Sequence, residues 1–294
     1  PQLSIVATSR LPLGARGEHV YHLQPLNRTD AVALFVDRAR GTCGEQLNQR
    51  LIAEVCDLLD GLPLAIEIAA AHVHSLSLPK LAERLHTGFI LNMPNARGAS
   101  GRHGTLRRLI DWSYAGLSPE RARMLRCLSV FSGGASLEAI EAVCAPNGAA
   151  GAHDPAAVVV GLIEQSLVVR RGTEDAPRYF LLESVRQYAH EKLREAGELP
   201  AARLEHLHYL AGAVQRLDQV RDNSSDNSQY VTVLRAEQEN LRATLDWLAN
   251  ADLDTLSTAG VAAINLVLGM FWYWYDQMQL QAGLHYLRAI GLRS

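Results

Sequence analysis

The sequence of 294 residues predicts a mainly α-helical, folded protein. Apolar residues recur at three- and four-residue spacing over most of the chain, and capping and turn residues divide this pattern into helix-sized segments. Only residues 166–171 and 178–183 alternate apolar and polar side chains, and the GTEDAP between them predicts a β-hairpin. An apolar fraction of 48% and a charged fraction of 20% are typical of a folded chain.

The first residues carry a different pattern. LSIVATSR, from Leu3 to Arg10, is a short apolar run that ends in polar residues, as the buried strands of parallel sheets do. A loop with Pro12 and two glycines follows, and residues 19–23 predict a second short strand. The chain begins without Met and directly in strand-like sequence, so we expect a piece of a longer protein without a secretory signal.

Four helices are predicted next, at 27–39, 46–59, 63–74 and from 77 onward. The second and third meet in LLDGLPLAIEIAAA, where Gly61 and Pro63 interrupt an apolar run. Gly is favoured just beyond a helix end and Pro at the first position of the next helix. The stretch therefore predicts a tight corner between two helices. It is either a plain corner or a binding loop whose helix N-terminus faces a ligand.

Residues 92–104, NMPNARGASGRHG, predict a linker. Its glycines do not make a phosphate-binding loop, because no strand precedes them and no Lys follows them. Helices at 105–117, 119–130, 137–144 and 156–165, the hairpin, and a helix at 184–196 then follow. This order predicts a winged-helix domain.

From residue 201 the pattern is helical except at 222–228, and the last predicted pair, 256–275 and 277–290, has the spacing of an antiparallel helical repeat. Residues 255–275 are uncharged and long enough to span a bilayer. Polar residues within this stretch and Asp at both of its ends favour a buried helix over a membrane span.

The net charge of −3 gives no overall footprint for nucleic acid. The helix before the hairpin has no basic residue, and the hairpin carries Arg170 and Arg171 together with two acidic residues. We expect this domain to pack as a regulatory flap, with DNA binding as the alternative. The four cysteines lack metal or redox spacing and predict reduced core thiols in a cytoplasmic protein. No catalytic or metal site is predicted.

Several of these stretches resemble STAND-class, NB-ARC-like signalling ATPases of the bacterial LuxR-type and SARP-type regulator branch. LLDGLPLAIEIAAA resembles their GLPL motif, and SIVATSR resembles their sensor strand. HLQPLNRTDAVALFVDRA matches the entry to their helical lid, whereas TLRRLIDWSYAGLSPERARMLRCLSVFSGGASLEAIEAVC and YFLLESVRQYAHEKL match their winged helix. EQENLRATLDWL resembles the linker before their TPR-like repeats.

This resemblance implies the following organisation. Residues 1–24 would end a P-loop-type α/β core, 25–91 would form the helical lid, 92–104 a linker, 105–200 the winged helix and 201–294 TPR-like helices. Arg10 would be the sensor arginine at the terminal phosphate of ATP, although a solvated strand-end Arg remains open. Gly61, Leu62 and Pro63 would contact the adenine base or the ribose.

Two departures from the family limit what this chain does alone. The Walker A and B motifs are absent, so the resemblance implies ATP or ADP with Mg²⁺ in a longer parent, a slow ATPase, and no tight nucleotide binding or hydrolysis by this chain. Leu181-Leu182-Glu183 stands where relatives have Met-His-Asp. Glu183 is therefore a candidate switch position that could pair with an Arg, or a simple helix-start carboxylate.

The resemblance thus implies a nucleotide-dependent switch in transcription regulation. Protein partners would bind the C-terminal repeats, DNA would be reached only through a domain outside this chain, and a nucleotide-dependent oligomer is one expected output. No membrane association is expected. The alternatives are a nucleotide-independent interaction scaffold and a DNA-binding winged-helix protein.

Overall fold

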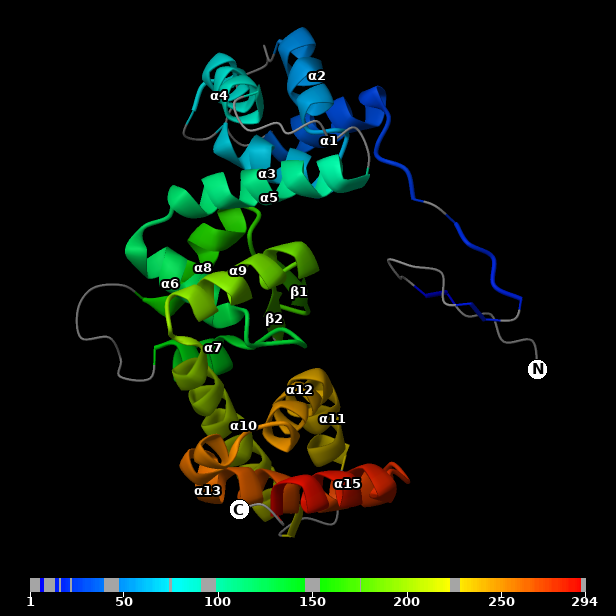
Figure 1. The fold of residues 1–294 in the computed structure, drawn as a ribbon, viewed down its shortest axis with the longest axis vertical. Coiled ribbons are helices and arrows are strands. Elements are labelled where there is room, and N and C mark those ends of the chain that lie inside the picture. Colours follow the sequence, from blue (N-terminus) through cyan, green and yellow to red (C-terminus); the bar gives the residue numbers. More distant parts are fainter. Residues whose placement is uncertain are drawn as a thin grey trace.

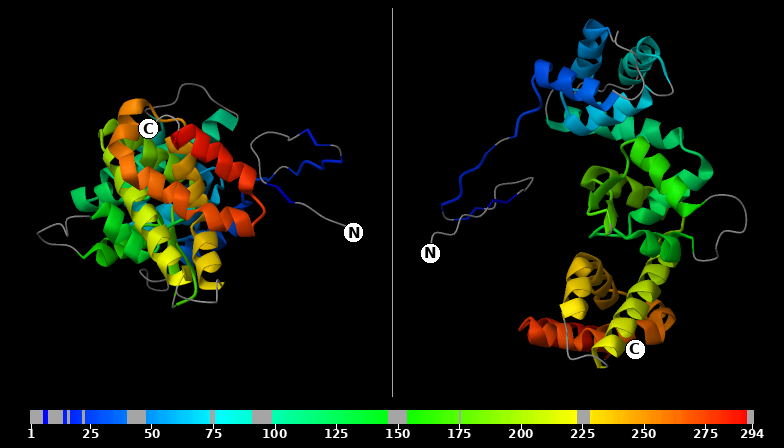
Figure 2. Two further views of the ribbon diagram at one scale, coloured as in Figure 1. Left: turned by 90° about the horizontal axis from the view of Figure 1, so that it is seen from below. Right: turned by 180° about the vertical axis from the view of Figure 1, so that it is seen from behind.

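The computed structural model is mainly α-helical, as predicted, with one two-stranded sheet in the residues it describes (Figure 1). From one end to the other it consists of a small helical bundle, a winged-helix region and a second group of helices, seen from two further sides in Figure 2. The described residues are 6–7, 14–15, 17–21, 23–39, 48–73, 76–90, 99–145, 154–174, 176–222 and 228–291.

The first bundle follows the predicted lid helices closely. Asn27 and Asn48 begin its first two helices with side-chain caps, the Asn48 Oδ1 accepting from the Arg50 N–H at 3.1 Å. α1 packs against α2 and α3, and α2 packs against α4, around fully buried Phe35 and Ile52. The helices are α1 (Arg28–Ala39), α2 (Gln49–Leu58), α3 (Pro63–His72) and α4 (Leu78–Ile90).

The winged helix forms in the predicted order. Ser118, Ser136 and Asp154 each accept a hydrogen bond from a backbone N–H in the first turn of the helix that they precede. The two strands pair antiparallel, and Ala135 adds a bridge to Tyr179 beside them. The elements are α5 (Ala99–Ala115), α6 (Pro119–Leu128), α7 (Leu137–Cys144), α8 (Pro155–Glu164), β1 (Val169–Gly172), β2 (Pro177–Phe180) and α9 (Glu183–Glu195).

The remaining helices form what we call the helical array. α10 packs against α13 within the array and also against α7 and α9 of the winged helix. The C-terminal α15 packs against α12, α13 and α14. The array comprises α10 (Leu199–Asp222), α11 (Ser228–Ala236), α12 (Gln238–Ala249), α13 (Leu253–Gly269), α14 (Phe271–Asp276) and α15 (Leu280–Gly291).

Two hydrophobic cores divide the molecule after α9. One core is continuous from α1 to α9, so the first bundle and the winged helix share buried apolar side chains. The other core lies within the array. Apolar burial therefore joins the first bundle to the winged helix. Tyr209 of α10 packs against both cores, and polar contacts contribute the rest of the junction between the winged helix and the array that is described below.

The N-terminal strands and the linker differ from prediction. Residues 19–21 and 23 form no strand, and Tyr21 and Leu23 are exposed, so their apolar side chains lack the burial that stabilises a strand. Most of 3–10, including Arg10, lies outside the described residues. Residues 99–104 of the predicted linker belong to α5, because extending a helix that is already packed costs little even through Gly.

The apolar C-terminal stretch is interrupted. Gly260 has φ 43° and ψ −126°, which breaks helical geometry inside α13, and Met270 separates α13 from α14. One face of α13, including Leu256 and Leu266, is buried, as the core-helix interpretation predicts. By length and composition alone, Leu253–Asp276 remains the one segment among the described residues that could cross a membrane.

The cysteines correct one prediction. Cys127 of α6 and Cys144 of α7, 17 residues apart, form a disulfide with a Cα–Cα separation of 5.7 Å. Sequence spacing could not show this pair, because only the packing of α6 on α7 brings the two together. Cys56 is a free, buried thiol as predicted, and burial raises its pKa to about 11. Cys43 lies outside the described residues.

Candidate functional site

The Gly61–Pro63 corner has the geometry that its sequence predicts. Gly61 has φ +64°, and a Cβ there would lie 2.5 Å from the Leu26 carbonyl oxygen. Its N–H donates to Cys56 O at 3.2 Å and its carbonyl accepts from Leu26 N at 2.9 Å. Leu62 is the N-cap of α3 without a side-chain cap bond, and Pro63 starts the helix. Only Gly fits this left-handed, crowded position.

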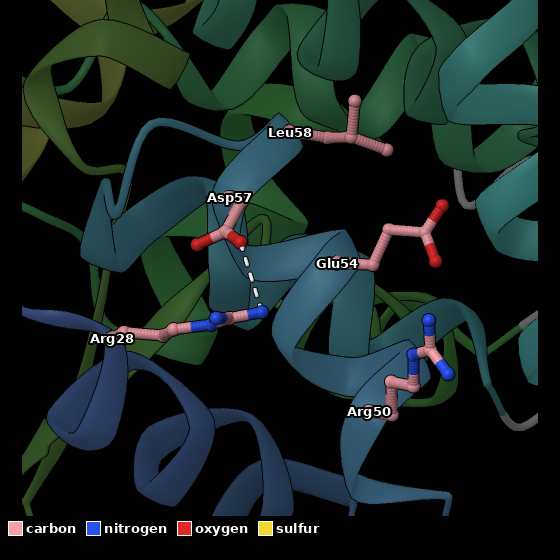
Figure 3. Close-up of a pocket in the computed structure, with 5 residues that line it drawn as sticks. All are labelled: Arg28, Arg50, Glu54, Asp57 and Leu58. Atoms are coloured by element: carbon pink, nitrogen blue, oxygen red, sulfur yellow. Dashed lines mark ion pairs between the residues drawn. The ribbon is translucent and has the colours of Figure 1, made fainter.

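The corner belongs to the same bundle as a charged surface hollow. Pro63 is exposed and Leu62 half-buried. Where α1 meets α2, an open hollow of about 370 Å³ is lined by two Arg and two acidic side chains, and Arg28 Nη2 lies 3.2 Å from Asp57 Oδ2 (Figure 3). The charges at this hollow balance, so it offers no excess positive charge to an anion. Arg10 lies outside the described residues, and the nucleotide assignments stay predictions.

Glu183, the predicted switch position, lies in the first turn of α9. Its carboxylate accepts hydrogen bonds from the Arg186 guanidinium at 2.9 and 3.1 Å and from Gln187 Nε2 at 2.5 Å. Glu183 is therefore a helix-start carboxylate that also pairs with an Arg, and its role as a switch position stays a prediction. Leu182 is the N-cap residue and packs against the apolar core.

α8, the helix before the hairpin, is poorly equipped to read DNA bases. The exposed side chains of α8 are Ala157, Val160 and Glu164, none of which donates a hydrogen bond to a base. Arg170 and Arg171 of β1 are exposed. Any DNA contact through this hairpin, which we call the wing, would therefore reach the phosphate backbone rather than base edges.

A polar network that the sequence analysis did not identify ties the wing to the helical array. The Nη1 of Arg178 in β2 donates to Glu237 Oε1 at 2.6 Å. Its Nη2 donates to the carbonyls of Gly133 and Gly134 at 3.2 and 2.9 Å. Glu237, between α11 and α12, is 9% exposed. We call this network, completed by Asn240, the wing clasp.

Asn240 of α12 is the centre of the wing clasp and is fully buried. Its Oδ1 accepts from Gly133 N at 2.9 Å, and its Nδ2 donates to Gly134 O at 2.9 Å and to Glu237 Oε2 at 2.6 Å. Gly134, with φ +69°, lies against the ring of Phe180 in β2. The one sequence signal for this network was the pair of Glu and Asn three residues apart in EQENLRATLDWL. Such a pair usually lies exposed on a helix surface, so it did not predict a buried network.

A second polar contact joins the same two parts. Arg126 of α6 forms a bidentate pair with Glu198, just before α10, at 2.7 and 2.8 Å, and its third donor reaches Tyr114 Oη at 2.8 Å. These contacts raise the pKa of Arg126 and lower that of Glu198. The junction between the winged helix and the array is therefore held by polar contacts at several points, which include a longer Arg216–Glu138 ion pair between α10 and α7 at 3.8 Å.

The middle part of the chain matches a known domain family. Residues 117–194 match the family "Winged helix-turn-helix domain". The match begins just before α6 and ends within α9, so it covers the three helices, the wing and most of the helix behind them. The chain therefore contains a winged helix-turn-helix domain, as predicted.

The chain as a whole is similar to mycobacterial proteins. "Putative HTH-type transcriptional regulator Rv0890c" of Mycobacterium tuberculosis and "Putative HTH-type transcriptional regulator Mb0914c" of Mycobacterium bovis are each 36% identical over 298 residues, covering 99% of this chain and 32% of the relative. "Uncharacterized protein Rv0894" of M. tuberculosis is 39% identical over 207 residues, covering 68% of this chain and 52% of the relative. The chain spans about a third of the length of the two named regulators.

Proposed function

We propose that this chain is the regulatory part of a transcription regulator, in which the winged helix transmits changes in the helical array to the first bundle. The wing clasp is the observation that carries the proposal. Arg178 and the 133–134 turn of the winged helix meet Glu237 and Asn240 of the array through buried hydrogen bonds. Separating a polar junction exposes less apolar surface than separating a shared hydrophobic core. This junction is therefore suited to a contact that changes between a docked and an undocked state.

The array is the part proposed to sense the signal. Its exposed apolar side chains, among them Val261, Leu268 and Trp272, contrast with its buried faces. Proteins that bind there would shift the position of α12 and, with it, the wing clasp. This proposal retains the predicted protein partners of the C-terminal helices and a cytoplasmic location, as expected for a regulator of transcription.

The proposal is tested by transcript profiling of strains that carry chromosomal variants. Asn240→Leu removes the centre of the wing clasp, and Asn250→Leu, at the exposed C-cap position of α12, is its control. We expect Asn240→Leu to alter the transcripts that deletion of the gene alters, and Asn250→Leu to leave them unchanged. If deletion alters transcripts and Asn240→Leu leaves them all at the wild-type level, the proposed role of the wing clasp is wrong.

Direct DNA binding is the second candidate, and the comparisons support it more directly than they support a nucleotide switch. The family match and the exposed Arg170 and Arg171 favour it. Two phosphate contacts predict a slope of about −2 for the logarithm of the binding constant against that of salt concentration. The double variant Arg170→Gln/Arg171→Gln should abolish this dependence. A salt-independent or undetectable interaction with duplex DNA rejects the candidate.

The nucleotide switch remains a proposal that rests on the family resemblance. It assigns ATP or ADP, with Mg²⁺, to a longer parent protein and places adenine against Gly61, Leu62 and Pro63, with Arg10 at the terminal phosphate. Substitution of Arg10 or Pro63 in that parent should weaken nucleotide binding. If the variants bind ATP and ADP with the same affinities as the parent protein does, neither residue belongs to the nucleotide site.

A further inference from the structure

A small cavity lies at the junction between the winged helix and the array. It has a volume of about 120 Å³ and opens between the end of α6, α9, α10 and α12. Its polar lining comes from both parts of the molecule. Ser132, Arg186 and His190 belong to the winged helix, and Arg203, His206 and Trp247 belong to the array.

Arg203 is the residue that makes this cavity unusual. Its guanidinium lies over the Trp247 ring, 5.6 Å from the centroid, and it has no carboxylate partner among the described residues. Burial alone lowers its pKa. A partly desolvated cation without an anion is costly, so such groups are normally paired. Arg203 therefore has binding capacity that the described protein residues leave unused.

The other lining groups make the cavity positive. Arg186 contributes a second guanidinium, although Glu183 shares its charge through two hydrogen bonds. Burial and then the charges of Arg203, Arg186 and Arg194 lower the pKa of His190. The buried His206 has a pKa lowered to about 4, and its Nε2 has no hydrogen-bond partner in the described part of the chain. None of the described residues that line the cavity is acidic.

We propose that this cavity binds a single phosphate group, either free phosphate or the phosphate of a larger molecule that projects from the opening. Arg guanidinium donors match the oxygens of phosphate in geometry, and the Ser132 hydroxyl adds a further donor. The volume is about four times the roughly 30 Å³ that a water molecule occupies, and it lies below the range of about 300 Å³ and above for pockets that enclose whole drug-sized ligands.

The bound phosphate group bridges the two parts of the molecule. Arg186 and His190 approach it from α9, and Arg203 approaches it from α10. Occupancy stabilises the junction that the wing clasp also holds, because a ligand that contacts both sides favours their docked arrangement. This inference does not depend on the proposed role in transcription, since it concerns binding to the chain itself.

Calorimetric titration of the purified chain with sodium phosphate, at constant ionic strength, tests the proposal. We expect saturable binding, which Arg203→Gln weakens about tenfold or more, since one charge-assisted hydrogen-bond pair is lost. Arg242→Gln, exposed on α12 and paired with Asp246 at 3.8 Å, should leave the affinity unchanged. Equal affinity in both variants overturns the proposal, because binding is then a general ionic effect.

A measurement on the unaltered chain covers the case in which Arg203→Gln fails to fold. The indole N–H resonance of Trp247, assigned with Trp247→Phe, should shift with phosphate to saturation, and those of the other tryptophans should not. An unmoved Trp247 resonance overturns the proposal. Titration with glycerol 3-phosphate then distinguishes the sources, since tighter binding than inorganic phosphate identifies a phosphate carried by a larger molecule, and weaker binding identifies free phosphate.

Discussion

Replacing Asn240 with Leu should weaken the attachment of the wing to the helical array. The side chain is fully buried and makes three hydrogen bonds, to Gly133 N, Gly134 O and the Glu237 carboxylate. Leu has a similar volume, so the substitution removes polar contacts without opening a large cavity. Asn240→Leu therefore isolates the hydrogen bonds of the wing clasp.

The magnitude follows from those three bonds. Each neutral bond contributes about 1 kcal/mol net, a bond to a carboxylate contributes somewhat more, and the unpaired Gly133 N–H adds a desolvation cost. Relaxation of the turn recovers part of this, so we expect a loss of about 3 kcal/mol in the free energy of unfolding. With a urea slope of about 2 kcal/mol/M, the midpoint falls by about 1.5 M.

Urea denaturation, with amide hydrogen exchange at Gly133 as a local probe, measures this prediction. Asn250→Leu is the matched control, because the Asn250 side chain is exposed and its Nδ2 donates to the Asp246 carbonyl at 2.7 Å within the same helix. The control should shift the midpoint by no more than about 0.3 M, in keeping with surface substitutions. An equal midpoint in the two variants, with Gly133 still protected, would refute the reasoning.

Three further predictions concern the corner, the turn and a buried histidine. Gly61→Ala should destabilise the chain by about 1–3 kcal/mol more than Gly197→Ala, since both have positive φ but only a Cβ at Gly61 meets a backbone oxygen, and urea midpoints compare the two. Gly134→Ala should cost about 2 kcal/mol or more and increase hydrogen exchange in β2, because its Cβ would lie 2.6 Å from the Phe180 ring; unchanged exchange contradicts this. Burial lowers the pKa of His206 from 6.5 to about 4, so between these pH values the unfolded chain binds more protons than the folded chain. The free energy of unfolding should therefore fall by about 3 kcal/mol as pH drops from 7 to 4. In His206→Asn the fall over the same interval should be smaller by about that amount.

Local signals in the sequence predicted the helices well. Asn27, Ser118, Ser136 and Asp154 each mark a helix start through a side-chain hydrogen bond to the first turn, which depends on neighbours only. The Gly61 corner was predictable for the same reason. The interruption at Gly260 was not, because Gly is tolerated within helices and only its surroundings decide.

The contacts between distant segments were beyond the sequence. Arg178 and Glu237 are 59 residues apart and Gly133 and Asn240 are 107 apart, so no local pattern links them. The Cys127–Cys144 disulfide has the same origin. In the sequence, Arg203 of the proposed phosphate cavity has the pattern of an ordinary surface residue of a helix. In the structure, its partial burial beside Trp247 distinguishes it.

A double-mutant cycle between Arg178 and Glu237 tests the central claim, the coupling of the wing to the helical array, most directly. Arg178→Met, Glu237→Gln and the double variant are unfolded in urea, with the exposed Lys192–Glu195 pair of α9 as a reference of about 0.3–0.5 kcal/mol. The account predicts a coupling free energy of about 2 kcal/mol for the half-buried pair across the junction. A coupling no larger than that of the Lys192–Glu195 reference would contradict it.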